Sequence, residues 1–107
     1  EPSVAVDVED REDSVVVTAD LPGYDRDDIE VTAQDDRLSV SAAREERHET
    51  EGEFVRRERH TERVSRTVSL PAAVDEDAAS ASYSDGVLTV TLPKAGDGDD
   101  GQRIDIE

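Results

Sequence analysis

The sequence predicts an all-β fold, a sandwich of about seven short strands. Apolar residues alternate with polar ones at period two, turn signals separate the alternating segments, and valine dominates the apolar residues. The 107 residues include 14 valines and 11 alanines but five leucines, and valine favours the pleated, half-buried surface of a sheet. Short alternating segments separated by turns are typical of a β-sandwich. The length fits one domain.

Four strands are predicted in the N-terminal part, where valine and isoleucine recur at alternate positions. The predicted strands are Val4–Val8, Ser14–Leu21, Ile29–Ala33 and Leu38–Ala42. Pro22-Gly23 is a turn signal after the second strand, and Asp35-Asp36 gives a tight connection between the third and the fourth. The third and fourth strands are therefore predicted to form a hairpin.

A charged segment over 44–61 interrupts this rhythm, and we predict a long exposed loop there. Beyond it the predicted strands are Val64–Leu70, Ala79–Tyr83 and Leu88–Leu92, with a loop or a single helical turn over 72–78. Asp85-Gly86 favours a type I′ turn, so the last two strands are predicted to form a second hairpin. The domain is predicted to cover residues 1–94, followed by a flexible acidic linker and a tail over 95–107.

Charge is the dominant compositional feature, because 12 basic against 29 acidic residues give a net charge of −17. Such a chain repels phosphate, so nucleic acid is not an expected partner. Self-repulsion of this size predicts a fold that salt stabilises. High charge also raises intrinsic disorder as an alternative, but the regular strand pattern argues against it. No apolar run approaches the length of a membrane span, so we expect no membrane contact and a cytoplasmic protein.

The sequence offers no catalytic residues, no cofactor-binding residues and no metal ligands. His48 and His60 lie in the charged segment without metal-ligand spacing, no serine sits in a G-x-S-x-G elbow, and there is no cysteine. The segment 97–101 lacks the spaced ligands and the closing glutamate of a calcium loop. Three aromatic residues also argue against a carbohydrate-active sandwich, which relies on aromatic platforms. We therefore expect no enzyme and no cofactor.

Ile104 and Ile106 stand beyond the linker, on the same side of an extended segment. An isolated polar tail has no reason to present two large β-branched residues to water, so both need an apolar surface. Two explanations remain open. The tail is either a final strand that closes its own sheet or an anchor that adds to a sheet edge of another subunit.

Several short motifs, weak one by one, become specific through their order and spacing. They are Asp20-Leu21-Pro22-Gly23, Phe54-Val55-Arg56-Arg57-Glu58-Arg59, Ser65-Arg66 with Leu70-Pro71, Ala81-Ser82-Tyr83-Ser84-Asp85-Gly86-Val87-Leu88 with Leu92-Pro93-Lys94, and Ile104-Asp105-Ile106. In this order they resemble the α-crystallin domain of the small heat-shock proteins, and the resemblance spans nearly all of the chain. It implies an immunoglobulin-like β-sandwich of about seven to eight strands with an extended C-terminal tail.

The resemblance also implies a function, partners and binding residues. It implies an ATP-independent chaperone, a holdase that binds partly unfolded client proteins, and a homodimer that assembles into higher oligomers through its tail. The implied dimer interface, made by a swapped strand in the charged segment, comprises Val4, Val6, Val8, Phe54, Val55, Arg57, Glu58 and Arg66. The implied anchors Ile104 and Ile106 dock into a groove of a neighbouring dimer formed by Ile29, Val31, Ala81 and Tyr83. The alternative is a co-chaperone or adaptor β-sandwich that binds one folded partner.

Overall fold

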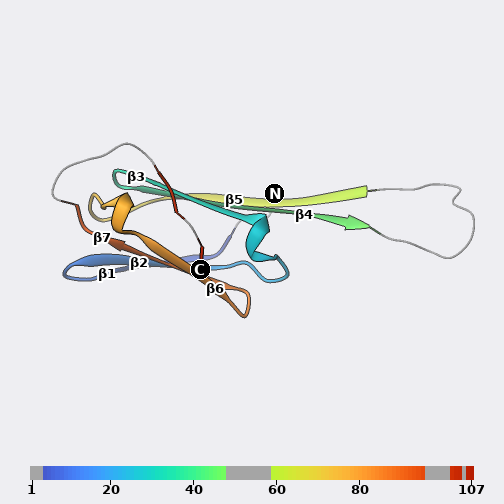
Figure 1. Ribbon diagram of the computed structural model, residues 1–107, viewed down its shortest axis with the longest axis horizontal. Helices are drawn as coiled ribbons and strands as arrows, with labels where there is room; N and C mark the ends of the chain where they lie inside the picture. The colour runs from blue at the N-terminus through green and yellow to red at the C-terminus, as the bar shows by residue number, and fades with distance from the viewer. Residues whose placement is uncertain (1–3, 48–58, 96–101, 105) are drawn as a thin grey trace, which may run out of the picture.

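Two antiparallel four-stranded sheets form the layers of a sandwich in the computed structural model (Figure 1). The structure describes residues 4–47, 59–95, 102–104 and 106–107. Within these ranges the first sheet has the strand order β1-β2-β7-β6, and the second has the order β5-β4-β3-β8. The predicted β-sandwich is therefore confirmed.

The strands are numbered along the chain, with one short 3-10 helix, η1, before β3 and a second, η2, before β6. Their bounds are β1 Val6–Asp10, β2 Ser14–Asp20, η1 Arg26–Asp28, β3 Ile29–Gln34, β4 Arg37–Arg47, β5 Arg59–Ser69, η2 Glu76–Ala78, β6 Ser80–Ser84, β7 Val87–Pro93 and β8 Gln102–Arg103. Helix η2 lies within 72–78, where a loop or a single helical turn was predicted. The first strand begins two residues later than predicted.

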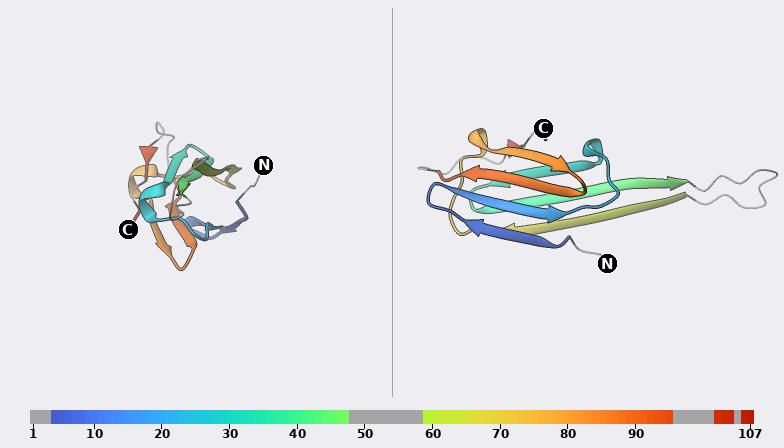
Figure 2. Two further views of the ribbon diagram at one scale, coloured as in Figure 1. Left: turned by 90° about the vertical axis from the view of Figure 1, so that its right-hand side faces the viewer. Right: turned by 90° about the horizontal axis from the view of Figure 1, so that it is seen from below.

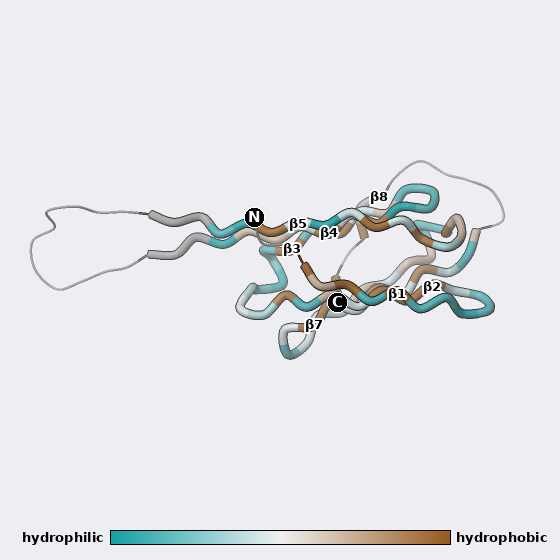
Figure 3. Tube along the Cα trace, turned by 180° about the vertical axis from the view of Figure 1, so that it is seen from behind, coloured by the Kyte–Doolittle hydropathy of each residue, from teal (hydrophilic) through white to brown (hydrophobic). Residues whose placement is uncertain are grey.

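The core lies between the two sheets and follows the alternation of the sequence. In β3, Ile29, Val31 and Ala33 are buried, whereas Glu30 and Thr32 between them are exposed. The same period of two holds in β6 and β7 because successive side chains of a strand point to opposite faces. Hydrophobic residues recur along the strands, and hydrophilic residues gather at the turns that join them (Figure 3).

Both predicted hairpins are confirmed, and their turns explain the choice of residues. Strand β6 pairs with β7 across Asp85 and Gly86, which have φ angles of 52° and 79°. A type I′ turn needs positive φ at both central residues, and Asp-Gly tolerates this. Strand β3 pairs with β4 across Asp35, with a φ of 55°. The buried carboxylate of Glu76 supports this turn by accepting the N–H of Asp35 at 3.1 Å.

The predicted loop over 44–61 is wrong at both of its ends. Strand β4 continues to Arg47 and β5 begins at Arg59, and these two residues are paired. Beyond Ala42, the last residue of β4 paired with β3, the segments 43–47 and 59–63 form a two-stranded ribbon that extends past the sandwich (Figure 1). The prediction failed because it relied on an apolar face, which a ribbon away from the core does not need. Residues 48–58 lie outside the described residues.

The two long sides of the sandwich differ in what lies along them. On one side, the C-terminal segment runs between β3 and β6. On the opposite side, β1 and β5 are the outer strands of their sheets (Figure 2). In the part of the chain that the structure describes, each of these two strands pairs with a strand on one flank only. We call them the tail side and the open side.

Candidate protein-binding site

The tail side holds the C-terminal segment against both sheets. Strand β8 pairs antiparallel with Thr32 and Ala33 of β3. The N–H of Ile104 then donates to the carbonyl oxygen of Val31 at 3.0 Å, and the Ile104 side chain is 4% exposed. Ile104 is therefore part of the core cluster.

The last residues cross from the second sheet to the first. Ile106 forms a parallel bridge with Ala81 of β6, and the N–H of Glu107 donates to the carbonyl oxygen of Ala81 at 2.8 Å. Ile106 is half-buried and packs against the core. The tail thus places its two isoleucines between β3 and β6.

The structure brings Ile104 and Ile106 together with Val31 and Ala81 of the predicted groove. Ile29 belongs to the same buried cluster. This contact lies within one chain, as a strand that closes its own sandwich would make it. Anchoring to a neighbouring dimer stays a prediction.

Tyr83 differs from the other groove residues in what its polar end contacts. The ring packs against the core, but the hydroxyl lies at 2.9 Å from the carbonyl oxygen of Tyr24 and also bonds the carbonyl of Leu21. Tyr83 therefore joins β6 to the loop that follows β2. The sequence indicated its place on the strand but not this bond.

The open side carries the predicted dimer residues that the structure describes. Val4 is buried, Val6 is half-buried and Val8 is 41% exposed. A guanidinium nitrogen of Arg66 on β5 donates to the carbonyl oxygen of Val4 at 2.9 Å. The structure thus brings Arg66 to the start of β1 and leaves an exposed valine farther along the same strand.

The remaining predicted dimer residues lie outside the described residues. They are Phe54, Val55, Arg57 and Glu58. The swapped strand and the dimer interface therefore stay predictions.

A cavity of about 170 Å³ opens where the open side meets the end of the sandwich. It is lined by Val4, Asp20, Leu21, Pro22, Tyr24, Glu62 and Val64. Five of these residues are apolar or aromatic, and Asp20 and Glu62 contribute two carboxylates. A second hollow, of about 370 Å³, lies on the outer face of the second sheet and is lined by polar and small side chains.

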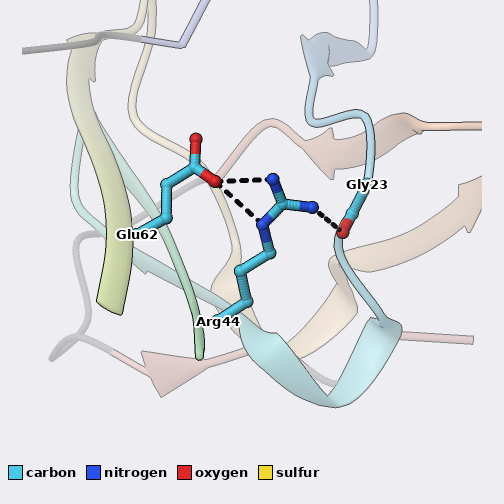
Figure 4. A network of polar contacts seen from close by, with 3 residues as sticks. All are labelled: Gly23, Arg44 and Glu62. Carbon is cyan, nitrogen blue, oxygen red and sulfur yellow. Dashed lines mark hydrogen bonds and ion pairs between the residues drawn. The ribbon is translucent and has the colours of Figure 1, made fainter. Parts of the chain in front are cut away.

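Sequence reasoning missed a polar cluster beside this cavity (Figure 4). Arg44 of β4 lies opposite Glu62 of β5 and binds its carboxylate through Nε, at 2.9 Å, and through Nη2. Its Nη1 donates to the carbonyl oxygen of Gly23 at 2.7 Å. The guanidinium carbon lies 5.3 Å from the centroid of the Tyr24 ring, within the range of a cation–π contact. The opposite charges were visible in the sequence, but assigning 44–61 to a loop hid their register.

Two kinds of site do not occur in the described ranges. No group of three or more histidine, cysteine, aspartate or glutamate side chains within 4–47, 59–95 and the described tail is placed to hold a metal ion. No helix among these residues has the length and apolar character needed to cross a membrane. The described surface does offer the unpaired flanks of β1 and β5 and two exposed valines, Val8 and Val87.

Comparison with known proteins agrees with the β-sandwich described above. The model of the Hsp20/alpha crystallin family matches residues 7–107. The chain belongs to this family. Membership confirms the resemblance that the order of the motifs indicated, and the family is one of small heat-shock chaperones.

Relatives within the family include proteins of several organisms. The chain is 45% identical over 91 residues to spore protein SP21 of Stigmatella aurantiaca, covering 84% of this chain and 54% of that protein. It is 40% identical over 105 residues to an 18 kDa heat shock protein of Clostridium acetobutylicum, covering 94% and 69% of the two chains. The chain therefore spans about half to two thirds of the length of these curated relatives.

Solved structures of the family have the same fold. Heat shock protein 16.0 from Schizosaccharomyces pombe superposes with a TM-score of 0.68 at 31% identity, covering 92% of this chain and 71% of that one. The hspA protein from Xanthomonas axonopodis gives a TM-score of 0.66 at 31% identity, covering 88% and 95%. The β-sandwich of this Hsp20/alpha crystallin family member is thus shared with both.

Proposed function

We propose that this chain acts as an ATP-independent chaperone, a holdase that binds partly unfolded proteins and keeps them from aggregating. Membership of the Hsp20/alpha crystallin family supports the proposal. The single observation that carries it is the apolar groove on the tail side, which Ile104 and Ile106 fill between Val31 and Ala81. A groove that accepts two isoleucines of an extended segment also fits an apolar, extended segment of a client.

The strength of the tail contact is compatible with exchange. Each isoleucine contributes about 1.5–3 kcal/mol when it is buried fully, and Ile106 is buried only in part. Ordering the linker costs about 1–2 kcal/mol for each residue whose backbone becomes fixed. We infer that the tail leaves and returns reversibly, and that a client occupies the groove while the tail is away.

The open side fits a second copy of the chain. Strand β1 has one flank free for pairing among the described residues, and added strands bind through backbone hydrogen bonds at such edges. The exposed Val8 and half-buried Val6 offer apolar contacts to a strand that carries Phe54 and Val55. We propose that two chains form a dimer in this way and that tails docked between dimers build larger assemblies.

The acidic surface supports the same function. A net charge of −17 keeps chaperone molecules apart and disperses the complexes that they form with clients. No catalytic step is needed for this action. The charge also predicts that binding of clients depends on salt.

Light scattering of a heated model client, with and without the chain and in the absence of ATP, tests the proposal. We expect scattering to fall as the ratio of chain to client rises, and to approach zero near equal mass. An unrelated acidic protein of similar size serves as the control, because it matches the charge without the groove. Scattering that is the same with the chain and with the control protein contradicts the holdase function.

A further inference from the structure

The ribbon formed by 43–47 and 59–63 leaves the sandwich at a point where the core stops supporting it. Ala42 is the last residue of β4 that pairs with β3, and it is buried. Beyond it, β4 pairs only with β5 among the described residues. Isolated two-stranded ribbons are marginally stable in water. The direction of this ribbon therefore depends on contacts at its base.

Arg44 of β4 makes such contacts with two other parts of the molecule. It lies on β4 in the ribbon, it binds Glu62 of β5 through two nitrogens, and it donates to the Gly23 carbonyl of the loop after β2 through the third (Figure 4). The planar guanidinium presents its donors in a fixed fork, which holds partners in a defined geometry. A lysine has the same charge but a single nitrogen, so it cannot hold both partners in this geometry.

The loop at Gly23 is shaped to receive this side chain. Gly23 has a φ of 85°, and a Cβ atom there would lie 2.6 Å from Nη1 of Arg44. The backbone conformation therefore favours glycine, and a Cβ atom at this position would displace the guanidinium from where it lies. The close fit indicates a contact that is built into the local structure.

The residues on either side of Gly23 fix the same loop to the first sheet. The hydroxyl of Tyr83 on β6 contacts the carbonyls of Leu21 and Tyr24, and the N–H of Leu21 donates to the carbonyl of Gly86 at 2.8 Å. The loop is thus held by the first sheet, and Arg44 holds the ribbon to the loop. In this way the first sheet orients a ribbon that belongs to the second.

We propose that Arg44 is the positioning residue of the ribbon and sets its direction relative to the sandwich. The inference rests on the proposed function, because the ribbon leads into the segment with Phe54 and Val55 that we propose to contact a second copy. A partner surface on such a segment is presented at a defined angle only if the base of the ribbon is fixed. Arg44 supplies a hydrogen bond between the start of the ribbon and the loop after β2. The backbone pairing of β4 with β5 does not provide such a link.

Electron paramagnetic resonance distances between two spin labels measure this direction. The sequence has no cysteine, so Thr61→Cys in the ribbon and Ser82→Cys on β6 place the labels uniquely. Labelled chains are diluted with unlabelled chains so that distances within one molecule dominate. We expect a narrow distribution for the parent and one about twofold broader for Arg44→Lys, as for a ribbon without support. An unchanged width in Arg44→Lys overturns the proposal.

Matched variants separate positioning from charge and from stability. Arg63→Lys changes an exposed arginine on the opposite face of the same ribbon, one pair away from Arg44, and should keep the parent width. Val68→Ala lowers the stability of the part of β5 that lies within the sandwich, and it should also keep the width of the parent distribution. Broadening in both controls equal to that in Arg44→Lys overturns the assignment. If Arg44→Lys does not fold, as judged by its circular dichroism, Glu62→Val replaces it as the test variant. A broader distance distribution in Glu62→Val supports the proposal, and a distribution as narrow as that of the parent contradicts it.

The proposed function is judged by a different measurement. Distances are recorded on the chain without client, and aggregation of a heated client is recorded separately. A chain with a narrow distribution and no holdase activity refutes the function and leaves the role of Arg44 standing. A holdase whose ribbon is equally broad in the parent and in Arg44→Lys refutes the role of Arg44 alone.

Discussion

The tail side and the open side are built from similar outer strands, yet their apolar residues are covered to very different degrees. On the tail side Ile104 is 4% exposed and Ala81 is 3% exposed, because the chain's own C-terminal segment covers the gap between the sheets. On the open side Val8 is 41% exposed. A tethered tail returns to its groove at a high effective concentration, whereas cover for the open side has to come from elsewhere. We therefore propose that the two sides serve different binding events, one releasable and one between subunits.

Removing the isoleucines is expected to have the largest effect, because it converts the tail side into a second open side. In the variant Ile104→Ala with Ile106→Ala, the tail loses about 1.5–3 kcal/mol for each isoleucine that was fully buried. We expect the tail to leave the groove, binding of a hydrophobic dye to rise, and the circular dichroism of the sandwich to persist. Fluorescence titration with the dye measures the exposed groove.

The mass of the same variant separates the two explanations for the tail. A fall from a larger assembly to dimers supports anchoring between subunits. An unchanged mass with an intact fold shows that the tail serves its own sandwich. Loss of the fold shows that the tail is a required closing strand, which refutes its release.

The second prediction concerns Val8 on the open side, with Val87 as its control. These are the two large hydrophobic residues that are exposed in the described part of the chain, at 41% and 37%. They belong to the same sheet, but Val8 is paired with core residue Val17, whereas Val87 is paired with exposed Asp20. The two valines therefore lie on opposite faces of that sheet.

If the inner face of β1 contacts a second copy, Val8→Asp should weaken the dimer by about 1.5 kcal/mol, roughly tenfold in dissociation constant. Val87→Asp should leave the dimer unchanged, because it lies on the face that points away from the other sheet. Sedimentation equilibrium measures both. Equal dissociation constants for the two variants would remove the dimer from the open side.

The strands and the tail were predictable because alternation reports directly on one buried face. The β3 residues Ile29, Val31 and Ala33 lie in the core as their spacing indicated, and Asp85-Gly86 forms the predicted turn. The ribbon was missed because Arg44 and Glu62 stabilise it through charge and register, and neither produces an apolar pattern. The same limit applies to Tyr83, whose place on β6 followed from alternation but whose bond to the loop after β2 depends on tertiary structure.

Whether the tail docks in its own chain or in a neighbour could not follow from the sequence. Ile104 and Ile106 need an apolar groove in either arrangement. The length of the linker before them does not decide whether that groove belongs to the same chain or to a neighbour. The two isoleucines therefore predicted contact with an apolar surface, and the family resemblance implied Val31 and Ala81 as part of it. The isoleucines themselves did not indicate which chain provides that surface.

Salt is expected to act on the open side more than on the tail side. Strand β1 carries Asp7, Glu9 and Asp10 on or beside its free edge, and the whole chain has a net charge of −17. Two chains that approach each other on this side therefore repel at low ionic strength. Raising salt from about 0.1 M to 1 M shortens the Debye length from about 10 Å to 3 Å. We expect the dimer to tighten and the thermal midpoint to rise by about 5 °C, which corresponds to about 1 kcal/mol for a domain of this size.

Dye binding of the parent is measured across the same salt series, and the tail variant, whose groove is exposed, serves as the reference. Because the tail contact depends on buried isoleucines, occupancy of the groove should change less with salt than dimer mass does. In the same buffers, dye binding measures groove occupancy, sedimentation measures dimer mass and scanning calorimetry measures the thermal midpoint. A thermal midpoint and a dimer mass that do not change across this range would show that acidic repulsion limits neither the stability of the fold nor the dimer.

The smallest expected effect tests whether the two sides are linked. Tyr83 lies on β6 at the tail side, and its hydroxyl holds the loop that Arg44 contacts at the open side. Tyr83→Phe removes the hydroxyl and keeps the ring in the core, so packing is conserved. Water can replace the lost donor at a half-exposed site, and we expect a cost near the low end for a hydrogen bond, about 0.5 kcal/mol.

The informative result lies in where protection from hydrogen exchange is lost. If the loop joins the sides, Tyr83→Phe should speed exchange at Leu21 and in the ribbon residues 43–47, while Ile104 keeps its protection because its bond to Val31 does not involve the hydroxyl. Ser82→Ala, an exposed neighbour on β6, is the control and should change neither region. Faster exchange confined to Leu21 would show that the loop is held by Tyr83 without passing any constraint to the ribbon, and the two sides would then act independently.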